Sequence, residues 1–166
     1  TSDKSLAFQE YHIVPDTENV SEAVAIGEKI QNTLEEIIIK DLGKESVMLG
    51  DEGGFTPKTN DIRKPLLYLV EAIKKNNLQD KVRLALDVAA SSFYENGLYK
   101  VEDLEHGRRV DGKNISKEEL MTVYGSLIKE FNLLSIEDPF HEEDFASFSE
   151  LKKNNRKLIV VGDDLT

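Results

Sequence analysis

Hydrophobic residues along the chain alternate between short, strand-like runs and longer stretches with helical spacing. Strands are predicted at residues 6–14, 82–90, 133–136 and 158–161. Amphipathic helices are predicted at residues 20–42, 61–78, 116–131 and 142–154. The charged stretch at 98–110 reads as an excursion that contains a hairpin. Because strands and helices alternate, the pattern predicts the α/β class, with a mainly parallel sheet covered by helices.

Helix boundaries are marked by capping residues. Asn19 precedes Glu22 by three residues, and Gly43 supplies a stop after the first helix. Ser116 and Glu119 form the same pair at the start of the third helix. A side-chain oxygen before a helix accepts a hydrogen bond from one of its first free N–H groups, and glycine tolerates the backbone that ends one. The helix limits are therefore predicted from local signals.

Acidic residues follow three of the predicted strands. Asp87, the pair Glu137-Asp138 and the pair Asp163-Asp164 each stand at a strand exit. The carboxyl ends of parallel strands meet on one face of such folds, and that face carries the active site. Several unpaired carboxylates close together repel one another unless a cation joins them. Oxygen ligands suit Mg²⁺, Mn²⁺ or Ca²⁺, so the spacing predicts a metal site.

A simpler interpretation of these acids is helix capping. An acid after a strand often serves as the N-cap of the next helix. Pro139 fixes the turn after Glu137-Asp138, so one of these acids can face the strand ends while the other serves the turn. We favour the metal site over independent caps, and both interpretations stay open at this point.

The glycine-rich segment Gly50–Gly54 contains Asp51 and Glu52. It lacks the lysine of a phosphate-binding loop and the spacing of a dinucleotide fingerprint. Flanking glycines allow a loop to approach a ligand closely, which would carry Glu52 inward. Taken alone, the segment is better explained as a flexible turn with two solvated acids.

Composition narrows the classes of function. The 166 residues carry 21 Lys and Arg against 32 Asp and Glu, for a net charge of −11, and no cysteine. Disulfides, thiolate metal sites and cysteine nucleophiles are therefore excluded. An acidic chain is a poor ligand for nucleic acid. No apolar run is long enough for a membrane span and no signal-type segment opens the chain, so we expect a soluble, cytoplasmic protein.

The histidines and the second acidic run have modest interpretations. His12 is expected to be a satisfied or surface side chain, His106 a solvated one, and His141 lies near the predicted strand ends, where a ligand-side role is conceivable. The run Glu142–Asp144 is predicted to form the first turn of the last helix, where negative charge is favoured.

Several segments together resemble enolase (phosphopyruvate hydratase). They occur in the order of that family and cover essentially the whole chain. The blocks are LAFQE at 6–10, GDEGGFTP at 50–57, LALDVAAS at 84–91, SIEDPF at 135–140 and VGDDLT at 161–166.

The resemblance implies the Mg²⁺-dependent, reversible dehydration of 2-phosphoglycerate to phosphoenolpyruvate in glycolysis. In the enolase superfamily, Mg²⁺ stabilises the intermediate formed when a weakly acidic proton is removed beside a carboxylate. Asp87, Glu137 and Asp163 match the metal ligands, and Glu137 and Asp163 also face the substrate. Glu52 matches the general acid, which needs a raised pKa. Gln9 and Glu10 match groups that line the substrate.

The family fold implied is part of a TIM barrel that begins strand, strand, helix, helix. Residues 6–14 would then be an antiparallel second strand, and 47–49 would belong to a loop between helices. We expect 1–166 to be a single segment of the C-terminal barrel domain, with the barrel not closed, since a full barrel needs about 250 residues. A full-length member would be a homodimer.

Some family features are not matched. The catalytic lysine of the family lies beyond the position of Thr166, so we expect these 166 residues alone to turn over no 2-phosphoglycerate. A family histidine before the Gln-Glu strand is missing from Thr1–Ser5, and Ser92 stands where a glutamate is usual. Two alternatives stay open: another member of the enolase superfamily, disfavoured by the Gly50–Pro57 block, and a non-catalytic metal-binding or interaction module whose open strand edges associate.

Overall fold

The computed structural model describes residues 6–46, 48–49, 55–57, 59, 61–101 and 114–163. Two compact units are recognised. Unit 1 consists of Thr1–Ser5, Ile13–Thr59 and Arg63–Arg83, and unit 2 of Leu6–His12, Asn60–Ile62 and Leu84–Thr166. Strands β1 (Glu10–Pro15) and β4 (Val82–Asp87) contribute residues to both units.

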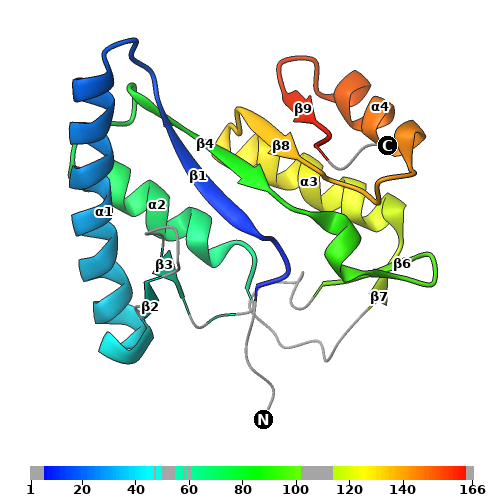
Figure 1. Ribbon diagram of the computed structural model, residues 1–166, viewed down its shortest axis with the longest axis horizontal. Coiled ribbons are helices and arrows are strands. Elements are labelled where there is room, and N and C mark those ends of the chain that lie inside the picture. Colours follow the sequence, from blue (N-terminus) through cyan, green and yellow to red (C-terminus); the bar gives the residue numbers. More distant parts are fainter. Residues whose placement is uncertain are drawn as a thin grey trace. The chain divides into compact units, whose positions relative to one another are not determined.

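Unit 1 is built around two helices, α1 (Val20–Leu42) and α2 (Lys64–Lys75), which lie side by side (Figure 1). Their facing sides bury isoleucine and leucine side chains at helical spacing, which is the main driving force for their association. The buried residues are Ile26, Ile30, Ile37 and Ile38 on α1, and Leu66, Leu69, Ala72 and Ile73 on α2. Two polar contacts fix the pair: Tyr68 Oη donates to Asp41 Oδ2 at 2.5 Å, and Asn76 Nδ2 donates to Thr33 Oγ1 at 2.9 Å.

A short two-stranded ladder lies between these helices in the sequence. The 3₁₀ turn Lys44–Ser46 is followed by β2 (Met48–Leu49), which pairs antiparallel with β3 (Phe55–Thr56). Residues 48–49 therefore do not belong to a parallel strand, in agreement with the family resemblance, but they pair with β3 instead of forming a plain loop.

The central sheet has the strand order β1-β4-β8-β9. In unit 2, β4 pairs in parallel with β8 (Ser135–Glu137), and β8 pairs in parallel with β9 (Ile159–Val161). In unit 1, Asp16 N–H donates to Lys81 O at 2.7 Å, so the end of β1 lies beside the start of β4. These two strands run in opposite directions (Figure 1). The described strands form no closed barrel.

Unit 2 contains the remaining elements. The 3₁₀ turn η2 (Ala90–Phe93) leads into an antiparallel sheet of three short strands, and two helices follow. These elements are β5 (Tyr94–Glu95), β6 (Leu98–Lys100), β7 (Asn114–Ile115), α3 (Lys117–Phe131) and α4 (Phe145–Asn154).

Aromatic side chains form the centre of unit 2. Tyr124 packs edge-on against Phe140 with ring centroids 5.5 Å apart, and Phe8 lies 6.0 Å from Tyr124. Tyr99 contacts Phe140 at 6.4 Å. All four side chains are buried. Because Phe140 follows the end of β8 by three residues, this cluster fixes the segment that leaves the strand at its carboxyl end.

The predicted α/β class is confirmed, and the predicted capping is largely correct. Asn19 Oδ1 accepts from Glu22 N–H at 3.1 Å, and Ser116 Oγ accepts from Glu119 N–H at 3.2 Å. Gly43 ends α1 with φ +87°. The first helix has the bounds predicted for it.

Other element bounds differ from the prediction. The first strand begins at Glu10 rather than residue 6, and the helix predicted at 61–78 covers only Lys64–Lys75, with Pro65 in its first turn. The prediction for Glu142–Asp144 is wrong, because α4 begins only at Phe145. Asp144 is instead its N-cap, accepting from Ser147 N–H at 3.1 Å. This residue occupies the cap because its carboxylate reaches two donors of Ser147.

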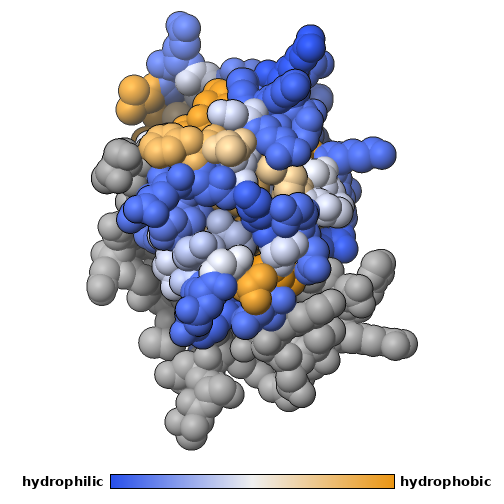
Figure 2. Space-filling view, turned by 90° about the vertical axis from the view of Figure 1, so that its right-hand side faces the viewer, coloured by the Kyte–Doolittle hydropathy of each residue, from blue (hydrophilic) through white to orange (hydrophobic). Residues whose placement is uncertain are grey.

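The described surface seen in Figure 2 is mostly hydrophilic, with hydrophobic side chains in small patches. In unit 2 the exposed large hydrophobic residues include Phe145, Ile159 and Val161. Two of them lie on β9, the last strand in the sheet order. Among the described helices, none combines the length and apolar character that crossing a lipid bilayer requires.

Candidate functional site

Asp87 and Glu137 lie opposite each other at the carboxyl ends of neighbouring parallel strands. They are register partners of β4 and β8, and Glu137 is in turn the register partner of Val161 on β9. Val88 N–H donates to Glu137 O at 3.0 Å, which continues the ladder past the two acids. Register partners on parallel strands project their side chains to the same face of the sheet, so the two carboxylates are neighbours.

Asp87 is the most perturbed acid described. Burial and, after it, the negative charges of Glu137, Glu10 and Asp138 raise the pKa of Asp87 from 3.8 to about 6, while His12 opposes the rise. Its Oδ1 atom is buried and has no hydrogen-bond partner among the described residues. A buried carboxylate oxygen without a partner is costly, because it has lost water and gained nothing in exchange. The site is therefore suited to an added cation.

Glu10 and His12 form a pair on β1. His12 Nε2 lies 2.6 Å from Glu10 Oε2, and both side chains are about half exposed, at 46% and 41%. Residues two apart on a strand share a face, which explains the contact. Since both residues influence the pKa of Asp87, they belong to the same electrostatic cluster in unit 2.

The two acids after Ile136, Glu137 and Asp138, have different surroundings. Asp138 is buried and has φ +44°, and its Oδ1 accepts from Asp163 N–H at 3.0 Å. The backbone continues the contact, because Asp138 N–H donates to Val161 O at 2.9 Å. Asp138 thus holds the turns after β8 and β9 together, and leaves Glu137 as the acid at the strand end.

The remaining predicted site residues are less well assembled. Asp163 is exposed and follows β9 by two residues, at the same end of the sheet as Asp87 and Glu137. Gln9 is exposed just before β1. Glu52 lies outside the described residues. Within the part of the chain that is described, no three His, Asp or Glu side chains are already grouped as a metal site would require. The predicted roles of these residues stay predictions.

Two contacts of the cluster go beyond what the sequence predicts. His12 is half exposed and bonded to Glu10, which agrees with the expectation of a satisfied or surface histidine, but its partner was not predicted. The available signal was the position of His12 two residues after Glu10 on a strand. Asp138 was grouped with Glu137, but its structural hydrogen bond to the turn after β9 depends on a residue 25 positions away in the sequence. No local pattern shows such a contact.

Comparison with known proteins identifies the lineage of this chain. The sequence model of the family described as enolase, C-terminal TIM barrel domain, matches residues 1–166. The chain belongs to the enolase family. The enolase of Methanocaldococcus jannaschii is 42% identical over 161 residues, or 96% of this chain. The enolases of Methanosarcina barkeri and Methanococcus aeolicus are 40% and 37% identical over 162 residues each, or 96% and 97% of the chain.

The chain spans only 36% of the length of each of these enolases. The alignments thus cover nearly all of this chain but only part of each related enolase. The family assignment agrees with the acids at the ends of β4 and β8.

Proposed function

We propose that this chain forms the first part of the catalytic barrel of an enolase, and that the complete protein catalyses the Mg²⁺-dependent, reversible dehydration of 2-phosphoglycerate to phosphoenolpyruvate. The observation that carries the proposal is the pairing of Asp87 with Glu137 at the ends of β4 and β8 in a chain of the enolase family, where the buried Oδ1 of Asp87 lacks a partner in the part of the chain that the structure describes.

The residues at this sheet end fit a magnesium ion. Asp87, Glu137 and Asp163 offer carboxylate oxygens alone, which is the donor type that Mg²⁺ prefers. The repulsion between Asp87 and Glu137 and the unpartnered oxygen of Asp87 among the described residues are both relieved by a divalent cation. When bound, Mg²⁺ supplies Lewis-acid stabilisation of negative charge on a substrate carboxylate. In this proposal the three acids hold the ion.

The chain's own residues prepare the site for charge. Asp87 is kept in place by the parallel pairing of β4 with β8, and its burial strengthens every electrostatic interaction that it makes. The contact with His12 orients the carboxylate of Glu10, which we assign with Gln9, Glu137 and Asp163 to the substrate. We assign Glu52 as the general acid that protonates the leaving hydroxyl.

Both compact units belong, in this proposal, to one barrel domain, because one family model covers them together. Among the described strands β9 is the last in the order of the sheet, and we propose that a further parallel strand pairs with it in the complete protein. For the complete enzyme we propose a homodimer in the cytoplasm.

A chimera tests the proposal. The segment of the Methanocaldococcus enolase that aligns with this chain is replaced by the chain itself, and phosphoenolpyruvate formation is measured with and without Mg²⁺. We expect a Mg²⁺-dependent activity that Asp87→Asn lowers by about 100-fold or more, because it removes a charge from the reacting centre. Glu150→Gln, on the exposed side of α4, is the matched control and should retain the activity of the chimera.

Folding of the chimera is established first by circular dichroism and size-exclusion chromatography against the parent enzyme. A folded chimera without activity contradicts the proposal. So does an Asp87→Asn chimera that keeps the activity of the unmodified one.

A further inference from the structure

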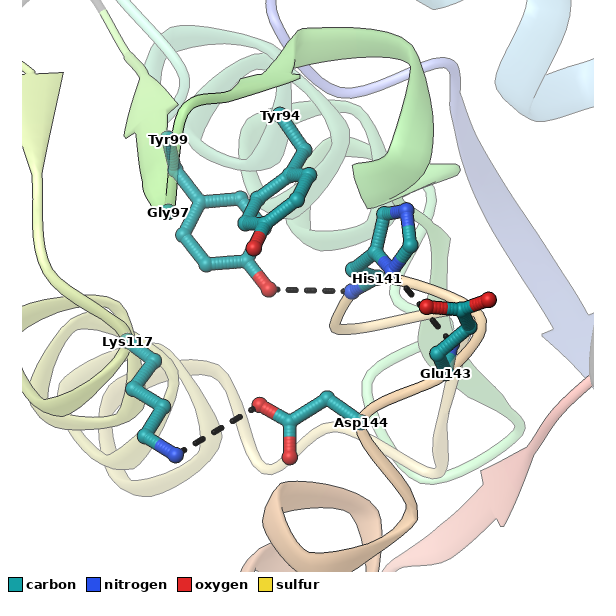
Figure 3. A pocket seen from close by; sticks show the side chains of 7 residues that line it. All are labelled: Tyr94, Gly97, Tyr99, Lys117, His141, Glu143 and Asp144. Atoms are coloured by element: carbon teal, nitrogen blue, oxygen red, sulfur yellow. Dashed lines mark hydrogen bonds and ion pairs between the residues drawn. The ribbon is translucent and has the colours of Figure 1, made fainter.

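A second candidate site lies in unit 2, away from the acids of β4 and β8. A cavity of about 430 Å³ opens between the β5–β6 hairpin, the start of α3 and the segment before α4 (Figure 3). It is lined by Tyr94, Gly97, Tyr99, Lys117, His141, Glu143 and Asp144. None of the residues assigned to the enolase reaction lines it. Its volume is in the range of sites that hold small molecules.

Tyr99 places a buried hydroxyl group at this cavity. Its side chain is 1% exposed, and its Oη accepts a hydrogen bond from the backbone N–H of His141 at 2.9 Å. The hydroxyl still has a hydrogen to donate, and none of the described residues accepts it. A buried donor without an acceptor costs free energy. The hydroxyl of Tyr94 likewise has no partner among the described residues. The hydroxyl groups of Tyr99 and Tyr94 can therefore donate hydrogen bonds to an oxygen atom of a ligand.

Acidic side chains face the cavity as well. Asp144 accepts from Ser147 N–H at 3.1 Å and from Ser147 Oγ at 2.7 Å, with Lys117 Nζ 3.9 Å from its Oδ2. Glu143 is exposed, and no described residue pairs with its carboxylate. An anion would meet these two carboxylates with a single lysine to offset them. The charges thus disfavour an anionic ligand.

The aromatic rings do not favour a cation either. Tyr94 is packed between two neighbours, with its ring centroid 5.1 Å from Tyr99 and 4.3 Å from His141 (Figure 3). A cation–π contact needs an open ring face. Lys117 adds a positive charge at the opposite wall. An ammonium or guanidinium group would therefore meet one charge of its own sign and no free aromatic face. Of the two carboxylates that could attract it, Asp144 is already engaged by Ser147 and Lys117, and Glu143 is exposed to solvent.

We propose that this cavity binds a small, neutral, polyhydroxylated molecule. A hydroxyl group both donates and accepts hydrogen bonds, so it matches a lining that mixes donors and acceptors. Ligand oxygens accept from Tyr99, Tyr94 and Lys117. Ligand hydroxyl groups donate hydrogen bonds to the carboxylates of Glu143 and Asp144. The carbon skeleton of the ligand packs against the edges of the Tyr94 and His141 rings.

The test uses three probes that share one skeleton and differ in charge. Glycerol is the neutral probe, 1-amino-2,3-propanediol the cationic one and glycerol 3-phosphate the anionic one, with D-glucose as a larger neutral probe. Each is titrated into ¹⁵N-labelled chain while amide shifts are recorded. We expect saturable shifts at His141 and its neighbours for glycerol and glucose, with affinities about tenfold higher than for either charged analogue.

Two variants assign the binding to the cavity. Tyr94→Phe removes a hydroxyl without a described protein partner, and Glu143→Gln removes a charge while keeping the shape. Both should weaken glucose binding about tenfold. Glu142→Gln is the matched control. Glu142 precedes Glu143 in the sequence, but its carboxylate does not line the cavity, so this variant should bind glucose as the parent chain does.

Absence of saturable shifts with the neutral probes overturns the proposal. Tighter binding of the cationic or the anionic analogue overturns the assignment of a neutral ligand, and equal weakening by Glu142→Gln overturns the assignment to this cavity.

Discussion

Asp87 and Glu137 are register partners on parallel strands, and Glu137 is the first of the charges that raise the pKa of Asp87. Two carboxylates in this position repel each other, and no described residue bonds the buried Oδ1 of Asp87 to offset its lost hydration. The pair therefore destabilises the metal-free chain.

Asp87→Asn should stabilise the metal-free chain near neutral pH. The folded-state pKa of Asp87 is about 6, above its ordinary value of 3.8. A raised pKa means that the folded chain binds a proton more tightly than the unfolded chain does, so stability falls as pH rises through that window. At about pH 4 and below the variant and the parent should be similar. Above about pH 6 the variant should be more stable by about 1 kcal/mol, after allowance for screening by solvent.

Urea unfolding at the two pH values measures the difference. The idea fails if Asp87→Asn is the less stable protein near neutral pH without metal.

Glu137→Gln should move the pKa of Asp87 back toward its ordinary value. The substitution removes the negative charge that contributes most to the raised pKa of Asp87 and keeps the shape of the side chain, while burial of Asp87 remains. The pKa should therefore fall without reaching 3.8. The carboxyl ¹³C shift of Asp87 followed against pH reports this value. Glu150→Gln should leave it unchanged, and an unchanged pKa in Glu137→Gln would remove Glu137 as a cause.

Tyr124→Phe should destabilise the chain by about 1–3 kcal/mol. The hydroxyl of Tyr124 is buried and donates to Pro139 O at 2.5 Å, in the turn that follows Glu137. Its removal leaves a carbonyl oxygen inside the protein without that donor. Tyr94→Phe is the matched control, because no described residue bonds its hydroxyl, and it should stay within about 0.5 kcal/mol of the parent. Equal stabilities of the two variants in urea would contradict the role given to this bond.

Ser116→Ala should cost about 1 kcal/mol of stability. Ser116 Oγ accepts from Glu119 N–H at 3.2 Å at the start of α3, and alanine leaves that donor to solvent. Ser126→Ala, at an exposed position inside the same helix, should be neutral or slightly stabilising because alanine has the higher helix propensity. Thermal or urea unfolding of both variants checks the difference. A loss in Ser126→Ala as large as that in Ser116→Ala would argue against capping.

Local signals in the sequence predicted local structure well. The bounds of α1 follow from Asn19 and Gly43, which act on their own helix ends. The acids at the strand ends were also recognisable, because a strand followed by an acid is a contiguous pattern. The sequence therefore predicts that Asp87 and Glu137 are neighbours.

The sequence could not show contacts that tertiary structure decides. The strand predicted at 82–90 ends at Asp87, because Ala89 takes φ +47° and Ala90 N–H donates to Asp138 O at 3.0 Å. The partner is 48 residues away, so no periodicity reveals it. The start of α4 was misplaced for a related reason: Asp144 caps the helix by reaching Ser147, and the acids before it fit a helical first turn equally well.

The central claim is that Asp87 and Glu137 together bind a divalent ion. Calorimetric titration of Mg²⁺ into this chain tests that claim most directly. The chain, Asp87→Asn, Glu137→Gln and the control Glu150→Gln are compared at the same pH. We predict saturable binding to the parent chain and to Glu150→Gln, and its loss in both site variants. Equal Mg²⁺ binding by all four proteins would contradict the account.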